Sequence, residues 1–109
     1  MIIDHRTYNV KPGKLNEYLK IYQAEALPLQ LKYQGHCVGW YVSTDIGRLN
    51  QIVHMWAYAS LADREERRDR LAADPAWPKF LEKAQPLLDS MENKILRAAP
   101  RFTIPELKG

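Results

Sequence analysis

The sequence predicts an α+β fold, in which a four-stranded antiparallel sheet carries two helices on one face. Four stretches rich in branched and aromatic residues alternate with two stretches of helical periodicity, in the order strand, helix, strand, strand, helix, strand. With right-handed crossovers this order gives the ferredoxin-like βαββαβ arrangement, with the first and third strands as central neighbours. The 109 residues show no repeat and no linker, so we predict one domain over residues 1–109, with residues 100–109 as a C-terminal tail.

The first half of the chain is expected to form a strand and then a helix. Residues 2–10 are rich in branched and aromatic side chains and end at a breaker, Lys11-Pro12-Gly13. Pro12 is suited to the first helical position, where its missing N–H is not needed. Apolar residues then recur at spacings of three and four, at Leu15, Tyr18, Leu19, Tyr22 and Ala26. We expect Pro28 to kink or end this helix, and Gln34-Gly35 to end it.

The second half is expected to form a hairpin, a second helix and a last strand. Residues 36–44 and 49–58 are predicted strands, joined by Asp45-Ile46-Gly47-Arg48. Ser60, with Asp63 three residues later, is a suitable N-cap for the helix. Asp74-Pro75 interrupts this helix and caps its continuation, which is expected to run to about Pro86. Residues 91–99 form the predicted last strand.

Composition excludes several classes of function. The net charge is only +3, and the densest charged run, residues 63–70, holds four arginines and four acids. This pattern gives no basic face for nucleic acid. Cys37 is the single cysteine, so no intrachain disulfide can form, and no cation near it in sequence favours a nucleophilic role. The N-terminus lacks a signal-peptide pattern and no apolar run could span a membrane, so we expect a soluble, cytoplasmic protein with no membrane partner.

Both faces of the predicted sheet are apolar, although two helices can cover only one. Along residues 51–58 one face carries Ile52, His54, Trp56 and Tyr58, and the other carries Val53, Met55 and Ala57. In the strand before it, Val38, Trp40 and Val42 share one face, and Gly39 and Tyr41 the other. An exposed surface of this kind favours a homodimer packed sheet to sheet. The alternative is that the tail folds back over this face, with Phe102, Ile104 and Leu107 as its anchors.

The second helix places arginines on its apolar side. A helical projection puts Leu61, Leu71 and Ala72 towards the sheet, together with Arg64 and Arg68. Because a buried charge needs a partner, these arginines either bind an anionic ligand, or pair with Asp4, Glu92 or helix neighbours, or extend to water. Arg67 and Arg70 each follow an acid by four residues, at Asp63 and Glu66, and are expected to form surface ion pairs.

The histidines do not predict a metal site, because His5, His36 and His54 show no metal-ligand spacing. His54 lies among aromatic residues, where it is either a core histidine or an acid, a base or a haem ligand. His54 and Tyr58 are therefore the candidate catalytic residues. No cofactor is predicted, although haem remains open. The candidate ligand-binding residues are Arg6, Tyr8, His54, Trp56, Tyr58, Arg64 and Arg68.

Several stretches together form a specific pattern that includes H-x-W-x-Y, S-L-x-x-R and D-P-x-W. They are Arg6-Thr7-Tyr8, Lys11-Pro12-Gly13, Ile46-Gly47, Leu49-Asn50, His54-Met55-Trp56-Ala57-Tyr58, Ser60-Leu61-Ala62-Asp63-Arg64, Arg67-Arg68, Leu71, Asp74-Pro75-Ala76-Trp77, Glu92, Leu96 and Pro100-Arg101-Phe102. Over nearly its whole length the sequence resembles the NIPSNAP family of small α/β-barrel proteins. One departure is Asp45, where the family usually has Glu before the hairpin glycine.

The resemblance implies a ferredoxin-like subunit that forms a dimeric α/β barrel, but no general reaction. Our leading hypothesis is a dimer that binds a small apolar or aromatic anionic molecule in a cleft between helices and sheet. Related dimeric barrels include cofactor-free monooxygenases and haem-binding or haem-degrading enzymes, so an enzyme of either type is an alternative. In a monooxygenase, His54 or Tyr58 would assist removal of a proton from a phenolic substrate. A protein-interaction module without a small-molecule site is the third hypothesis.

Overall fold

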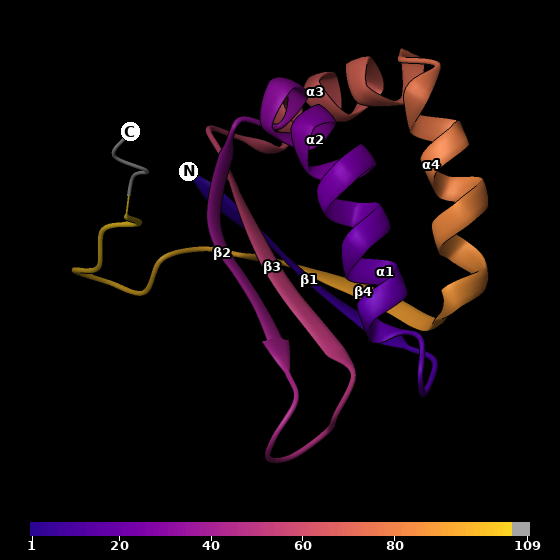
Figure 1. The fold of residues 1–109 in the computed structure, drawn as a ribbon. Coiled ribbons are helices and arrows are strands. Elements are labelled where there is room, and N and C mark those ends of the chain that lie inside the picture. The colour runs from indigo at the N-terminus through magenta and orange to yellow at the C-terminus, as the bar shows by residue number, and fades with distance from the viewer. Residues whose placement is uncertain (106–109) are drawn as a thin grey trace.

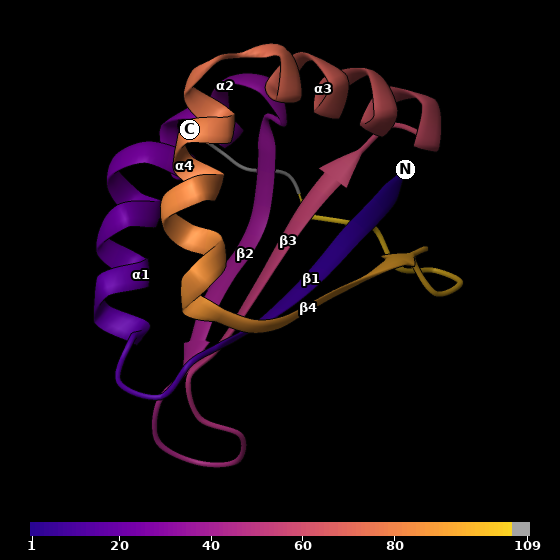
Figure 2. The same cartoon turned by 90° about the vertical axis from the view of Figure 1, so that its right-hand side faces the viewer.

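The computed structural model describes residues 1–105 and shows one layer of helices on one layer of sheet (Figures 1 and 2). One continuous helical segment follows the first strand, and two further helices follow the hairpin. The elements are β1 (Ile2–Val10), α1 (Leu15–Ile21), the π-helix η1 (Tyr22–Ala26), α2 (Leu27–Tyr33), β2 (His36–Ser43), β3 (Gln51–Tyr58), α3 (Leu61–Ala73), α4 (Ala76–Ala84), the 3-10 turn η2 (Gln85–Leu87) and β4 (Leu88–Leu96).

The sheet has the predicted ferredoxin-like topology. Its strand order is β2-β3-β1-β4, and each neighbouring pair is antiparallel. The central pair β1 and β3 places Arg6 opposite His54 and Asp4 opposite Trp56. All helices lie on the same face, as both cartoon views show (Figures 1 and 2). This face is called the helix face below, and the other is called the open face.

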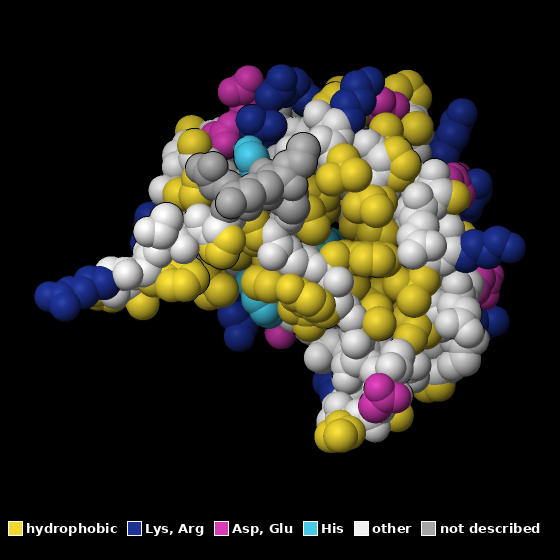
Figure 3. Space-filling model, turned by 60° about the vertical axis from the view of Figure 1, so that its left-hand side comes forward, with side chains coloured by type: hydrophobic (Ala, Val, Ile, Leu, Met, Phe, Trp, Pro, Cys, Tyr) yellow, Lys and Arg dark blue, Asp and Glu magenta, His cyan; other side chains and the backbone are white. Residues whose placement is uncertain are grey.

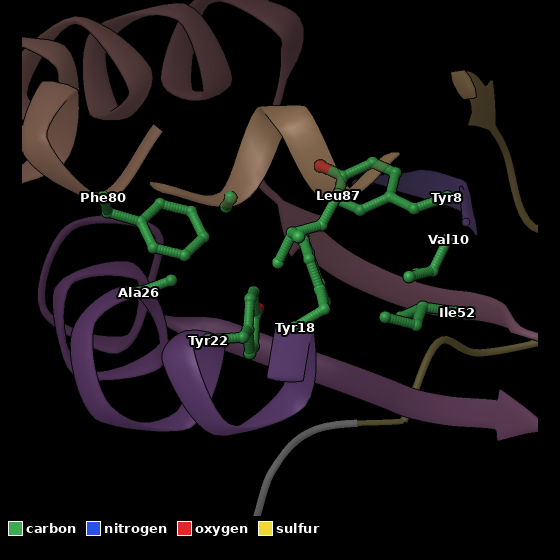
Figure 4. Close-up of a cluster of buried hydrophobic side chains, with 9 residues drawn as sticks. Tyr8, Val10, Tyr18, Tyr22, Ala26, Ile52, Phe80 and Leu87 are labelled. Carbon is green, nitrogen blue, oxygen red and sulfur yellow. The ribbon is translucent and has the colours of Figure 1, made fainter. Parts of the chain in front are cut away.

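The main core lies between the helix face, α1, η1 and α4. Its buried residues come from β1, the first helical segment, β3, α4 and η2, and Figure 4 shows how they converge. Tyrosines are unusually prominent in this core, and a second buried cluster continues it towards α2. The main cluster is Tyr8, Val10, Tyr18, Tyr22, Ala26, Ile52, Phe80, Ala84 and Leu87, and the second is Ile2, Trp56 and Tyr58.

The first helical segment passes through Pro28 without ending, because a π-turn precedes the proline. The N–H of Leu27 bonds to the carbonyl of Tyr22, five residues earlier. A proline inside a regular α-helix lacks a donor and clashes with the carbonyl four residues before it. The wider π-turn accommodates the proline and lets α2 continue to Tyr33. The helix therefore contains a π-turn before Pro28 where a kink or an end was predicted, and the predicted end at Gln34-Gly35 is confirmed.

Capping residues act at the second helical region as predicted. The hydroxyl of Ser60 accepts a hydrogen bond from the backbone N–H of Asp63 at 3.1 Å, and the Asp63 carboxylate accepts one from Ala59 at 3.0 Å. Asp74 then caps α4 by accepting from the N–H of Ala76 at 2.9 Å. Fewer residues of α3 are buried against the sheet than predicted. Leu71 is buried, but Leu61 and Ala72 are exposed.

Several element boundaries differ from the sequence predictions, including the start of β3 at Gln51 and the end of β4 at Leu96, and so does one side-chain direction. Pro12 lies in a turn before the helix, which begins at Leu15. β4 starts at Leu88, three residues earlier than expected, because η2 leads directly into it. A register shift between Cys37 and Gly39 turns Val38 onto the open face, where it packs with Ile3 and Ala57 rather than sharing a face with Trp40. A bulge of this kind cannot be seen in simple alternation.

The tail covers only part of the open face. Ile104 is buried against Ile3 and Ala57, whereas Phe102 remains 60% exposed. Leu107, the third predicted anchor, lies outside the described residues. A hollow of about 240 Å³ remains between the tail and the sheet, lined by Ile3, Val38, Met55, Phe102, Ile104 and Pro105. Figure 3 shows hydrophobic side chains over a broad area of the side of the molecule where the tail lies.

Candidate functional site

His54 lies at the centre of the helix face and is fully buried. It stands on β3 between Arg6 of β1 and Trp40 of β2. The indole N–H of Trp56, two residues along the same strand, donates to His54 Nδ1 at 2.9 Å. Because an indole nitrogen can only donate, Nδ1 must be unprotonated, so the proton of the neutral imidazole is on Nε2. No side chain or backbone group of residues 1–105 accepts from this buried Nε2.

His54 is held in its neutral form. Burial, followed by the positive charge of Arg6, lowers the pKa of His54 from 6.5 to about 3. At neutral pH the ring therefore cannot take up a proton. The structure gives His54 the chemistry of a hydrogen-bond donor through Nε2–H, in place of the base that the sequence suggested.

A ring of aromatic side chains separates His54 from a small cavity. The rings of Tyr8 and Tyr22 contact the imidazole in T-shaped arrangements, with ring centroids 4.8 and 6.1 Å away. The cavity has a volume of about 30 Å³ and lies between the helix face, η1 and α4, where Figure 4 shows Tyr8, Tyr18, Tyr22 and Phe80 converging. Its lining is Tyr8, Tyr18, Tyr22, Gln30, Trp77, Phe80, Leu81, Ala84, Gln85, Leu88 and Met91.

Tyr8 is polarised by a chain of hydrogen bonds along β1. Arg6 Nε donates to the Tyr8 hydroxyl at 2.9 Å, and Arg6 Nη1 donates to the Asp4 carboxylate at 3.1 Å. These side chains point the same way because alternate residues of a strand share a face. Since the guanidinium can only donate, the Tyr8 oxygen accepts and its own proton is available for another acceptor. Tyr8 is therefore a second donor beside the cavity.

Asp4 anchors this chain as a buried carboxylate. It accepts from Arg64 Nε at 3.0 Å and from the Asn93 amide at 3.1 Å, besides Arg6. Burial alone would raise the pKa of Asp4, but the charge of Arg6 and the hydrogen bonds of Asn93 and Arg64 outweigh it and lower the pKa. Arg64 also pairs with Glu65. Of the two interpretations of Arg64, the structure favours the ion pair with Asp4 over a free anion site.

The other predicted site residues, Tyr58 and Arg68, lie at the end of β3 and on α3. Tyr58 accepts a hydrogen bond from Gln34 Nε2 at 2.7 Å and packs with Ile2 and Trp56. It is four residues from His54, or about 13 Å along an extended strand. Arg68 is half-buried on α3. Its charge lowers the pKa of His54 by less than burial or the charge of Arg6 does. The predicted pairs of Arg67 with Asp63 and Arg70 with Glu66 are present, at 2.9 and 3.7 Å.

The structure therefore separates the predicted residues by role. Tyr8 lines the aromatic cavity, and His54 lies behind the rings of Tyr8 and Tyr22, where Trp56 orients it. Arg6 and Arg64 bind Asp4, whereas Tyr58 and Arg68 do not line the cavity. Sequence reasoning missed the cavity residues from the helical segment, above all Tyr22 and Gln30, whose side chains are hydrogen-bonded to each other. It also missed Trp40 as part of the site. The observed register of β2 and β3 puts Trp40 directly across from His54, whereas the predicted strand ends would have put it across from Val53.

The site does not fit a metal or haem. No group of three or more potential metal ligands lies together in residues 1–105. A haem ligand must offer a free nitrogen lone pair, but in His54 one nitrogen accepts from Trp56 and the other carries the proton. Cys37 offers no alternative ligand, because burial raises the pKa of its thiol. Among the described helices, none is both long and apolar enough to span a bilayer.

Known proteins match both the sequence and the fold. A protein NipSnap homolog from Dictyostelium discoideum is 37% identical over 91 residues, which cover 84% of this chain and 40% of that protein. The chain thus spans about two fifths of the length of this curated relative.

Solved structures agree with this match. A nipsnap family protein with unknown function from Agrobacterium tumefaciens has a TM-score of 0.89 and 43% identity, and the match covers 96% of this chain and 94% of that one. A putative antibiotic biosynthesis monooxygenase from Nitrosomonas europaea shares the fold, with a TM-score of 0.67 and 12% identity over 90% of this chain and 98% of that one. The family model NIPSNAP matches residues 3–101. The chain belongs to the NIPSNAP family.

Proposed function

We propose that the protein binds a small aromatic or apolar molecule that carries an oxygen acceptor, between η1, α4 and the sheet. The observation that carries this proposal is the buried Nε2–H of His54, which has no acceptor in residues 1–105. Buried donors are nearly always paired, and an unpaired one is a cost that a ligand oxygen would remove. The Tyr8 proton supplies a second donor beside the same cavity.

Binding requires side chains of the helices to move. A cavity of about 30 Å³ has room for roughly one water molecule, and an aromatic ring needs several times more. Trp77 and Leu81 of α4 line the cavity and are only half-buried, so they can turn outward without breaking the main core. We expect the ligand ring to take the space that these two side chains leave.

Substitution of His54 by Phe tests this function. The variant keeps an aromatic ring but removes the donor, so we expect the dissociation constant of acetophenone, a small aryl carbonyl, to rise about tenfold. Isothermal titration calorimetry of the full chain measures this change. The matched control is His36→Phe, because His36 is exposed at the start of β2 and should leave binding unchanged. Equal binding by wild type and His54→Phe would remove His54 from the site.

A cofactor-free monooxygenase is the second candidate, and the two donors of the site favour it. The His54 and Tyr8 protons could stabilise the negative oxygen of a deprotonated phenol, which is the form that reacts with oxygen. With a pKa of about 3, His54 cannot itself remove the phenol proton. Oxygen uptake with 1-naphthol, lowered in His54→Phe, would support this activity. No uptake above the protein-free rate would leave binding as the function.

We also propose that two copies associate through the open face. The helices leave this face without cover, and the tail protects only the corner around Ile104. Tyr41 is 61% exposed there, next to half-buried Val53 and Met55. Apolar area of this extent is typical of an interface.

Val53→Glu places a charge at the centre of this face and should convert the dimer into a monomer. Light scattering at micromolar concentration should give wild type a mass twice the 12.7 kDa of the chain, and the variant a single chain mass. Ile46→Glu is the control, because Ile46 is 91% exposed in the hairpin loop. A well-behaved monomer of the wild type would contradict the proposal.

A further inference from the structure

Trp40 lies beside His54 in the same buried layer. The two residues are directly opposite each other on β2 and β3, on the helix face, where paired side chains start about 5 Å apart. The ring of Tyr22 covers both. It stacks on Trp40 with centroids 5.3 Å apart and planes 15° apart, and it meets the edge of His54 at 6.1 Å.

Both residues carry a donor without an acceptor. Trp40 Nε1 and His54 Nε2 are buried nitrogen atoms with no hydrogen-bond partner in the part of the chain that the structure describes. Neither can change role, because an indole nitrogen only donates and the Trp56 hydrogen bond fixes the proton of His54 on Nε2. Two neighbouring donors of this kind need an acceptor that the folded chain does not supply.

We propose that Trp40 and His54 together bind one carbonyl oxygen of the ligand, so that Trp40 is a specificity-determining residue of the site. This inference rests on the proposed binding function and names the ligand class, a neutral aryl carbonyl. Trp40 is neutral and so is His54 above its pKa. The nearest cation, Arg6, already donates to Asp4 and Tyr8. A carboxylate would therefore enter a buried site without a free counter-charge.

Tyr22 controls the route to these donors. Its ring lines the cavity on one side and contacts Trp40 and His54 on the other. It belongs to the π-helix, and its hydroxyl donates to the buried Gln30. A ligand ring that occupies the cavity must displace Tyr22 for its oxygen to reach the donor pair.

The test is an NMR titration of the ¹⁵N-labelled wild-type protein with three probes of similar size. Acetophenone offers a carbonyl, ethylbenzene offers no acceptor, and benzoate offers a carboxylate. The chain gives three indole N–H signals, from Trp40, Trp56 and Trp77, and the spectrum of Trp40→Phe identifies the one that belongs to Trp40. We expect acetophenone to move the Trp40 N–H signal downfield and ethylbenzene to leave it in place. We also expect acetophenone to bind more tightly than either other probe, because a site built around a hydrogen bond rejects an analogue that cannot accept it.

The outcomes distinguish failure of this inference from failure of the proposed binding function. If acetophenone moves the ring signals of Phe80 and Tyr18 but not the Trp40 N–H, the molecule binds without the donor pair and only the inference fails. The inference also fails if ethylbenzene or benzoate binds as tightly as acetophenone. It fails again if the Trp40 N–H is already hydrogen-bonded in the free protein and does not respond. If no probe binds, the proposed function and the inference fail together.

Discussion

Asp4→Asn is expected to lower the free energy of unfolding by roughly 3–5 kcal/mol, because it removes one partner of a buried ion-pair network. Asp4 is completely buried and is the shared acceptor of Arg6, Arg64 and Asn93. The neutral amide keeps the shape of the side chain but leaves Arg6 without a counter-charge and Arg64 with only the exposed Glu65. Urea unfolding at pH 7 and a fixed protein concentration measures the change.

Asp89→Asn is the matched control, since Asp89 is exposed on β4 and its loss should shift stability by less than about 0.5 kcal/mol. The Asp4 network also has a pH signature. The folded pKa of Asp4 lies below its unfolded value of 3.8, so its stabilisation is present above pH 3.8 and is lost as the pH falls through the folded pKa. Equal stability of Asp4→Asn and wild type would show that the arginines have other partners.

Wild-type stability is expected to fall by about 1.4 kcal/mol for each pH unit between roughly pH 6 and pH 4, owing to His54. The unfolded state binds a proton at His54 with a pKa of 6.5, whereas the folded state does so only near pH 3. Between these values the unfolded chain holds more protons, so stability is complete above pH 6.5 and declines as the pH falls. The total loss between the two pKa values is on the order of 5 kcal/mol.

His54→Phe should flatten this dependence, because the variant has no group to protonate at that position. Urea midpoints from pH 4 to pH 7.5 provide the measurement, and the difference between the variant and wild type should shrink as the pH falls. His36→Phe, which alters an exposed histidine, should keep the wild-type slope. A wild-type slope in His54→Phe would assign the effect to another group.

The architecture was predictable because it depends on sequence patterns that can be recognised without knowing which residues are in contact. The strand order, the central pair of β1 and β3, and the Ser60 and Asp74 caps all follow from periodicity and local hydrogen bonding. The errors occur where contacts between elements decide the local structure. β4 starts early because η2 leads into it, and the bulge at Cys37 to Gly39 turns one side chain to the other face.

The site was predictable only in part. Strand parity correctly placed His54 with Trp56, and the register brings this pair to the same face as Arg6 and Tyr8. The direction of the Trp56 hydrogen bond, which makes His54 a donor, depends on rotamers that alternation does not specify. Arg64 had two interpretations because its partner, Asp4, is 60 residues away in sequence. The aromatic cavity depends on the π-turn, which leaves no periodic signal.

The π-turn at residues 22–26 also changes which residues of the first helical segment share a face before and after it. One extra residue in a turn rotates everything after it by about 100° relative to an unbroken helix. Tyr18 and Tyr22 thus share one face at the start of the turn, and Gln30 is brought beneath them after it. In an unbroken α-helix Gln30, eight residues after Tyr22, would lie about 80° around the axis from it, and the residue taken up by the π-turn brings Gln30 back to the face of Tyr22. The pocket therefore depends on the π-turn as well as on the identity of its side chains.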